Sequence, residues 1–215
     1  MIRTMFTWAL GLGLVALAGT SANAQGFGGR GGGGMGGPAL LANKSVQKEL
    51  KLTDEQAEKA SAVATEMREK MMEKMQDIPQ EERREKMPAI MAEMNKEAMK
   101  SLKEILKPEQ VTRFEQINIQ VAGLQAFSRP EVAEKLKVTD EQKEKIKALQ
   151  DESQASMREI FQGAGDDREG AMKKIAELRK ETFEKAVALM SDDQKNAWKE
   201  LTGEPFTLVQ ERRPN

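Results

Sequence analysis

An internal repeat constrains the fold of this chain more than any other feature. Residues 46–56 (VQKELKLTDEQ) match residues 132–142 (VAEKLKVTDEQ) without a gap. Residues 106–110 (LKPEQ) answer residues 190–194 (MSDDQ), after a two-residue difference in length that falls where each copy is expected to form a loop. Self-similarity of this kind indicates that one structural unit is used twice. We therefore predict two units, residues 40–126 and 127–203, followed by a C-terminal tail, residues 204–215.

The repeated T-D-E-Q segments have the spacing of a helix cap. In a capping box, a Ser or Thr hydroxyl accepts a hydrogen bond from the first turn of the helix, and a Gln three residues later accepts one from the Ser or Thr N–H. The acidic residues between them lie where the helix dipole favours negative charge, and their polar surroundings favour capping over acid/base catalysis. Lys107 stands at the corresponding position before Gln110, so we expect that cap to be lost. The motif comprises Leu52, Thr53, Gln56, Leu106, Gln110, Val138, Thr139, Gln142, Ser191 and Gln194.

Apolar residues after each cap recur at spacings of three and four, which is the period of an α-helix. In the first copy they predict a helix from 53 to about 78, a loop at 79–83 and a returning helix that ends near 105. In the second copy, Gly163, Ala164 and Gly165 form the turn between two such stripes. Aromatic residues make up only 4% of the chain, so narrow apolar stripes are expected to do most of the packing. We predict an all-α fold of elongated hairpins, in two tandem three-helix units that pack as an internal pseudo-dimer cradle.

The first residues have the pattern of a secretory signal peptide. A charged start, a short apolar run at 6–18 and an A-x-A site at 22–24 predict cleavage before Gln25. Residues 25–39 are nearly all glycine and predict a flexible leader, in which the single Arg30 favours a spacer over an RNA-binding tail. No later segment is apolar enough to span a membrane. We therefore predict a signal peptide (residues 1–24) and an exported, periplasmic protein that does not span the membrane after cleavage.

The chain contains no cysteine and no histidine. Disulfides and thiol chemistry are therefore excluded, and the commonest general base and the commonest transition-metal ligand are missing. A formal net charge of -1 gives no indication of nucleic-acid binding. No phosphate-binding loop can be recognised. We expect a protein without enzymatic activity, cofactor, metal site or nucleic-acid partner.

The motif at 52–56, answered by a second helix start at 106–110, resembles the LTXXQ family of Spy/CpxP-like periplasmic proteins. Val138 replaces the family's Leu in the second copy, and residues 106–110 and 190–194 keep only the apolar and Gln ends. The resemblance covers roughly residues 40–202, counted as two family units. It implies a helical cradle that holds unfolded or partly folded exported proteins without ATP, or alternatively an envelope stress regulator whose partner is a membrane sensor. Family members are typically one-unit chains that dimerise, so an internal pseudo-dimer and a homodimer of chains both remain open.

Methionine is concentrated in the first predicted hairpin, where eight of the 14 Met residues lie between Met67 and Met99. The simplest interpretation is a hairpin seam, because the spacing is that of a helix core. A second is a binding surface, since Met repacks against many shapes and neighbouring basic residues attract acidic clients. A third is Cu(I) binding by thioethers, in a metal-responsive (Cu/Zn) protein, although the His and Cys ligands that zinc sites use are missing. Our functional hypothesis assigns client binding to Met67, Met71, Met72, Met75, Met87, Met91, Met94, Lys70, Lys74, Arg83 and Arg84.

Overall fold

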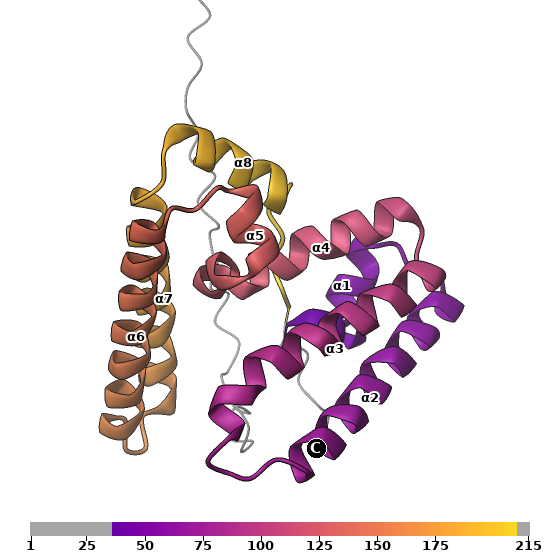
Figure 1. The fold of residues 1–215 in the computed structure, drawn as a ribbon, viewed down its shortest axis with the longest axis horizontal. Coiled ribbons are helices and arrows are strands. Elements are labelled where there is room, and N and C mark those ends of the chain that lie inside the picture. Colours follow the sequence, from indigo (N-terminus) through magenta and orange to yellow (C-terminus); the bar gives the residue numbers. More distant parts are fainter. Residues whose placement is uncertain (1–35, 210–215) are drawn as a thin grey trace, which may run out of the picture.

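The computed structural model describes residues 36–209, including all their side chains except those of Arg84 and Pro88. This part of the chain is built from helices alone (Figure 1), which confirms the predicted all-α class. The predicted signal peptide, most of the glycine-rich leader and the end of the tail lie outside the described residues. Within residues 36–209, no helix combines the length and the hydropathy that a bilayer-spanning segment needs.

The first half of the fold is a long hairpin with short helices packed at its base. The hairpin consists of α2 (Asp54–Gln76) and α3 (Arg83–Ile105), and we call it the first arm. The 3-10 helix η1 (Gly37–Ala42) packs against both of its helices, and α1 (Lys44–Glu49) follows η1. The third helix, α4 (Pro108–Ala122), begins directly after the arm and leads towards the second half. Gly37 and Pro38, expected at the end of the leader, are buried in η1.

The second half repeats this plan. Its long hairpin consists of α6 (Asp140–Gly163) and α7 (Arg168–Ala188), and we call it the second arm. The short helices η2 (Gly123–Ser128) and α5 (Pro130–Lys135) precede it, and α8 (Asp192–Thr202) follows it. The sequence pattern did not reveal η1, α1, η2 or α5, because six residues are too few to show a helical period.

Two apolar cores lie at the bases of the arms. In the first, Leu40, Leu41 and Phe114 are completely or almost completely buried. The second is centred on three aromatic rings, and the Phe127 and Trp198 centroids lie 4.5 Å apart, while that of Phe183 lies 6.0 Å from Phe127. Helix α4 serves both cores, because its Ile117 is buried in the first while its Ile119 packs against the second.

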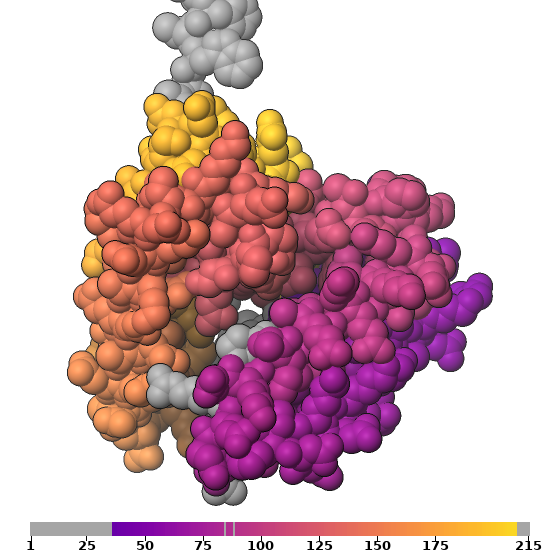
Figure 2. Space-filling view, in the orientation of Figure 1, coloured from indigo at the N-terminus to yellow at the C-terminus, as the bar shows by residue number. Residues whose placement is uncertain are grey.

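The two arms leave a common base on the same side. Figure 1 shows α4, α5 and α8 in the base, whereas the loops that close the two arms lie together at the lower edge of the view. Figure 2 shows the surface hollowed between the arms. The contact of α4 with α8 joins the two halves directly.

Residues 203–209, which we call the strap, return from α8 to the first half. The Gln120 side chain on α4 accepts a hydrogen bond from the Phe206 N–H (2.8 Å). The Asn43 amide donates to the Val209 carbonyl (2.8 Å), and Arg113 donates to the Glu204 carbonyl (2.8 Å). Phe206 also packs against the first core. The strap therefore fastens the second half to the first.

Candidate functional site

Each long hairpin is entered through the same backbone turn. After α1, Lys51 has a φ of 50°, and the Leu52 N–H donates back to the Gln47 carbonyl (3.0 Å). This is the Schellman motif, in which the second residue after the helix closes the last turn. After α5, Lys137 has a φ of 52° and the Val138 N–H makes the equivalent bond, at 2.9 Å. The apolar residue of the L/V-T-D-E-Q motif is thus the closing residue of the preceding helix.

The predicted capping boxes are formed at the start of both long hairpins. The Gln56 N–H donates to Thr53 Oγ1 (3.2 Å), and the Thr53 N–H donates to Gln56 Oε1 (3.2 Å). Thr139 and Gln142 make the same two bonds, at 3.2 and 3.0 Å. Ser191 and Gln194 form a third box at the start of α8. These side chains organise helix starts, which is an architectural role.

The start of α4 differs from the expectation of a lost cap. The Lys107 side chain has no acceptor, so it cannot complete a capping box. The Gln110 carbonyl oxygen nevertheless accepts a hydrogen bond from the Lys107 N–H (2.9 Å). The glutamine half of the cap therefore remains, and Pro108 occupies the first helical position, where no N–H is needed.

The motif glutamines also join the start of one helix to the start of another. Gln56 Nε2 donates to Gln110 Oε1 (2.9 Å), and Gln110 Nε2 donates to the Leu50 carbonyl at the end of α1 (3.0 Å). Gln142 and Gln194 form the same amide pair in the second half, with bonds of 2.8 and 2.9 Å. This pairing was not predicted from the sequence, although the recurrence of Gln at the second helix start of each copy indicates it.

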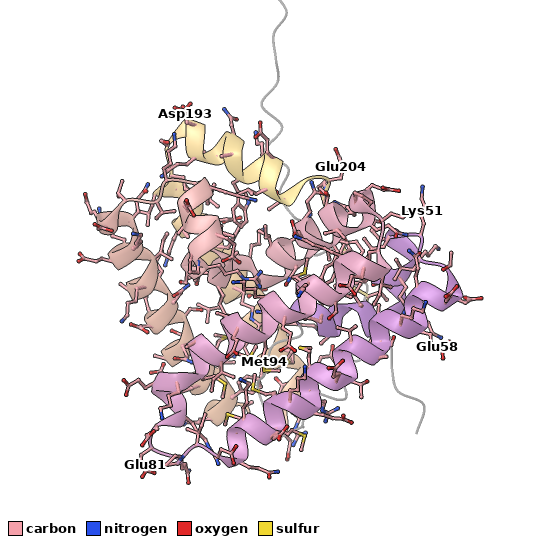
Figure 3. The ribbon with its side chains drawn as sticks, turned by 45° about the vertical axis from the view of Figure 1, so that its right-hand side comes forward. Lys51, Glu58, Glu81, Met94, Asp193 and Glu204 are labelled. Carbon is pink, nitrogen blue, oxygen red and sulfur yellow. The ribbon has the colours of Figure 1, made fainter. Side chains whose placement is uncertain are left out.

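The methionines of the first arm fall into three classes of burial. Met67 and Met94 are buried, with 7% and 5% exposed, and belong to the hairpin seam in this conformation. Met72 and Met91 are exposed, at 57% and 42%. Four further methionines are half-buried, and these are Met71, Met75, Met87 and Met99. Figure 3 shows Met94 with other sulfur atoms gathered near it.

The basic residues of the proposed surface are engaged within the arm. Lys70 forms ion pairs with Glu97 on the facing helix and with Glu66 on its own helix, and Lys74 lies 3.2 Å from Glu93. The hydrogen bond to Glu97 raises the pKa of the Lys70 ammonium, and the same bond lowers the pKa of the Glu97 carboxyl. Charge attraction to an acidic client would therefore compete with pairing across the hairpin.

Two arginines of the proposed surface lie at the loop that closes the first arm. Arg83 Nε donates to the Ile78 carbonyl (3.0 Å), which ties the start of α3 to the loop. The side chain of Arg84 is not among those that the structure describes. Arg83 therefore has a local structural role in addition to its charge.

The two arms differ most at their distal ends. Met87 and Met91 align with Ala171 and Ile175 of the second arm. Ala171 and Ile175 are buried, with 4% and 2% exposed, whereas Met91 is exposed. None of the described side chains between residues 68 and 93 is buried. In Figure 1 the α2 and α3 ribbons separate towards their loop. The first arm therefore has an open, methionine-lined seam at positions where the second arm is closed.

Comparison with known proteins found no family model, no curated protein and no solved structure that matches the chain. The resemblance to the LTXXQ family therefore depends on the motif residues alone. In the described part of the chain, no three acidic side chains come together in a group that could hold a metal ion. The open seam of the first arm is the candidate functional site.

Proposed function

We propose that this protein is an ATP-independent periplasmic chaperone that holds unfolded or partly folded exported proteins on its first arm. The observation that carries the proposal is the open seam, where exposed and half-buried methionines replace the buried Ala171 and Ile175 of the second arm. Exposed apolar side chains that gather on one surface are typical of interaction sites. Flexible thioether side chains can adapt to clients of many shapes.

The proposed cradle consists of both arms. We regard the two halves as tandem units of one ancestral repeat, packed as an internal pseudo-dimer around the shared base. The repeated Schellman turns, capping boxes and glutamine pairs support this interpretation. The exposure of Met91 would give an unfolded segment access to the open seam. Export through the signal peptide at 1–24 would bring the chain to such clients.

A client-aggregation assay tests the proposal. The mature chain, residues 25–215, should suppress aggregation of a chemically denatured client at near-stoichiometric ratios. Replacing Met72→Ser and Met91→Ser should weaken suppression, because both side chains are exposed and their loss leaves the buried core intact. The matched control is Met157→Ser with Met172→Ser, which makes the same chemical change in the second arm. No suppression at several-fold excess, or equal loss in both variants, would contradict the proposal.

A metal-responsive regulator is the second candidate. The half-buried thioethers of Met71, Met75 and Met87 favour it, because they are soft ligands on two facing helices and Cu(I) prefers such ligands. Calorimetric titration of the mature chain with Cu(I) and Zn(II) separates the two functions. Tight, saturable Cu(I) binding that Met75→Leu abolishes would favour the regulator, while heats no larger than dilution would favour the chaperone.

A further inference from the structure

We propose that the first arm is a reversible oxidation site, in which conversion of its methionines to sulfoxides by a peroxide opens the distal half of the α2–α3 hairpin. The chain has no cysteine, so the thioethers of its methionines are the sulfur groups that an oxidant can modify. In the reaction, the thioether sulfur gives two electrons to the peroxide O–O bond, which breaks. One oxygen stays on sulfur and the other leaves as water. Methionine sulfoxide reductases reverse the change, so the site can be reset.

The methionines of the first arm differ in exposure, and those open to solvent should react with peroxide first. Met72 and Met91 are open to solvent, at 57% and 42% exposed. Met67 and Met94, at 7% and 5%, are shielded where the seam meets the first core. Oxidation should therefore begin in the distal half of the arm and proceed towards its base.

Little else holds the distal half together once its methionines are oxidised. A sulfoxide is polar, so returning it to an apolar seam carries a desolvation cost. No described side chain between residues 68 and 93 is buried. The polar contacts that join the two sides of this segment are the ion pairs of Lys70 and Lys74 across the hairpin and the Arg83 hydrogen bond to the Ile78 carbonyl at the loop. Exposed ion pairs of this kind contribute little to stability. The seam methionines are thus the weak point of the arm.

The second arm provides a comparison within the same molecule. At the positions of Met87 and Met91 it carries Ala171 and Ile175, which are buried and cannot form sulfoxides. Its own Met157 and Met172 are half-buried. Peroxide should therefore open the first arm while the second arm keeps its buried contacts.

The first experiment follows oxidation itself. The mature chain is treated with hydrogen peroxide, and peptides are quantified by mass spectrometry at successive times. Met72 and Met91 should oxidise about tenfold or more faster than Met67 and Met94, because access to the sulfur sets the rate. Equal rates for the exposed and the buried pair would overturn the proposal.

The second experiment measures opening by hydrogen exchange. After oxidation, protection of the backbone amides in residues 68–93 should fall by about tenfold or more, while that of α6 and α7 is retained. Treatment with methionine sulfoxide reductases A and B should restore it. A leucine variant keeps the side-chain volume and cannot be oxidised at these positions, so it should not respond. This variant carries Met71→Leu, Met72→Leu, Met75→Leu, Met87→Leu and Met91→Leu.

Retained protection in the oxidised protein, or an equal loss in the leucine variant, would overturn the proposal. The readout needs no client, so it is independent of the proposed chaperone function. Failure of the aggregation assay would contradict client holding and leave the oxidation result standing. Suppression of aggregation by a protein that keeps its protection after oxidation would contradict the oxidation site and leave client holding standing.

Discussion

Lys51 and Lys137 adopt the left-handed backbone conformation at the turn between a short helix and a long one. In this conformation the Cβ of an L-amino acid crowds the following carbonyl, which a glycine avoids. The strain is accepted at both positions because the turn brings Leu52 and Val138 back to close the preceding helix. The two lysines therefore mark the positions where the backbone of each repeat is least relaxed.

Replacing Lys51→Gly should stabilise the protein. Relief of the left-handed strain exceeds the added entropy of the unfolded glycine, so the free energy of unfolding should rise by about 0.5–1 kcal/mol. Urea denaturation of the mature chain provides the measurement. The control is Lys48→Gly, inside α1, which should instead lower stability by about 0.5–1 kcal/mol. A decrease for both variants would show that the turn is not strained.

The two glutamine pairs should differ in their contribution to stability. Gln110 is buried, at 7% exposed, whereas Gln194 is partly open to solvent. Gln110→Ala leaves the buried Leu50 carbonyl without its Gln110 donor, while the Gln56 amide keeps the Ile105 carbonyl as an acceptor. The substitution should therefore cost about 2–3 kcal/mol, against about 1 kcal/mol for Gln194→Ala. Thermal unfolding of both variants tests this order. Equal costs would mean that burial of the first pair is unimportant.

At the scale of the helices, the features that depend on residues close together in the sequence could be predicted. The capping boxes and the apolar stripes of the long hairpins are local patterns, and α2 ends at Gln76, close to the expected end near 78. The pairing of Gln56 with Gln110 joins residues far apart in the chain, and no local pattern reveals it. The exposure of Met91 likewise depends on the separation of α2 and α3, which the spacing of apolar residues does not define.

The cross-hairpin pair of Lys70 and Glu97 should give the first arm a weak dependence on pH, because exposed ion pairs contribute little to stability. The pKa of Glu97 is lowered in the folded arm, so its stabilising contribution is present above the ordinary Glu pKa and is lost as pH falls through the lowered value. The pKa of Lys70 is raised, so the opposite loss occurs as pH rises through that value. Hydrogen exchange of residues 68–93 should show a step on the acid side that Glu97→Gln removes. A step that persists in Glu97→Gln would assign it to another carboxylate.

At the scale of the whole molecule, the arrangement of the arms depends on two connections. Helix α4 contributes side chains to both cores, and the strap returns from α8 to pack Phe206 against the first core. Figure 1 shows the two arms extending from this base on the same side. We infer that the distance between the arm loops is controlled at the base.

Removing the strap should loosen the arms without unfolding them. The chain lacks cysteine, so Glu81→Cys and Asp166→Cys place two dyes in the loops of the first and second arms. In a chain that ends at Gly203, single-molecule energy transfer should give a broader distribution of distances than in a chain that ends at Val209. Circular dichroism checks that both retain their helix content. Identical distributions would mean that α4 alone sets the geometry.

The strap also bears on the order in which the protein matures. Synthesis proceeds from the N-terminus, so the first arm is made well before residues 203–209. Until the strap arrives, the surface that Phe206 and Leu208 cover in the first core is uncovered. Completion of the first half therefore waits for a segment that follows the whole second half in the chain. The open seam is presented on a finished base only after nearly the whole described chain has been made.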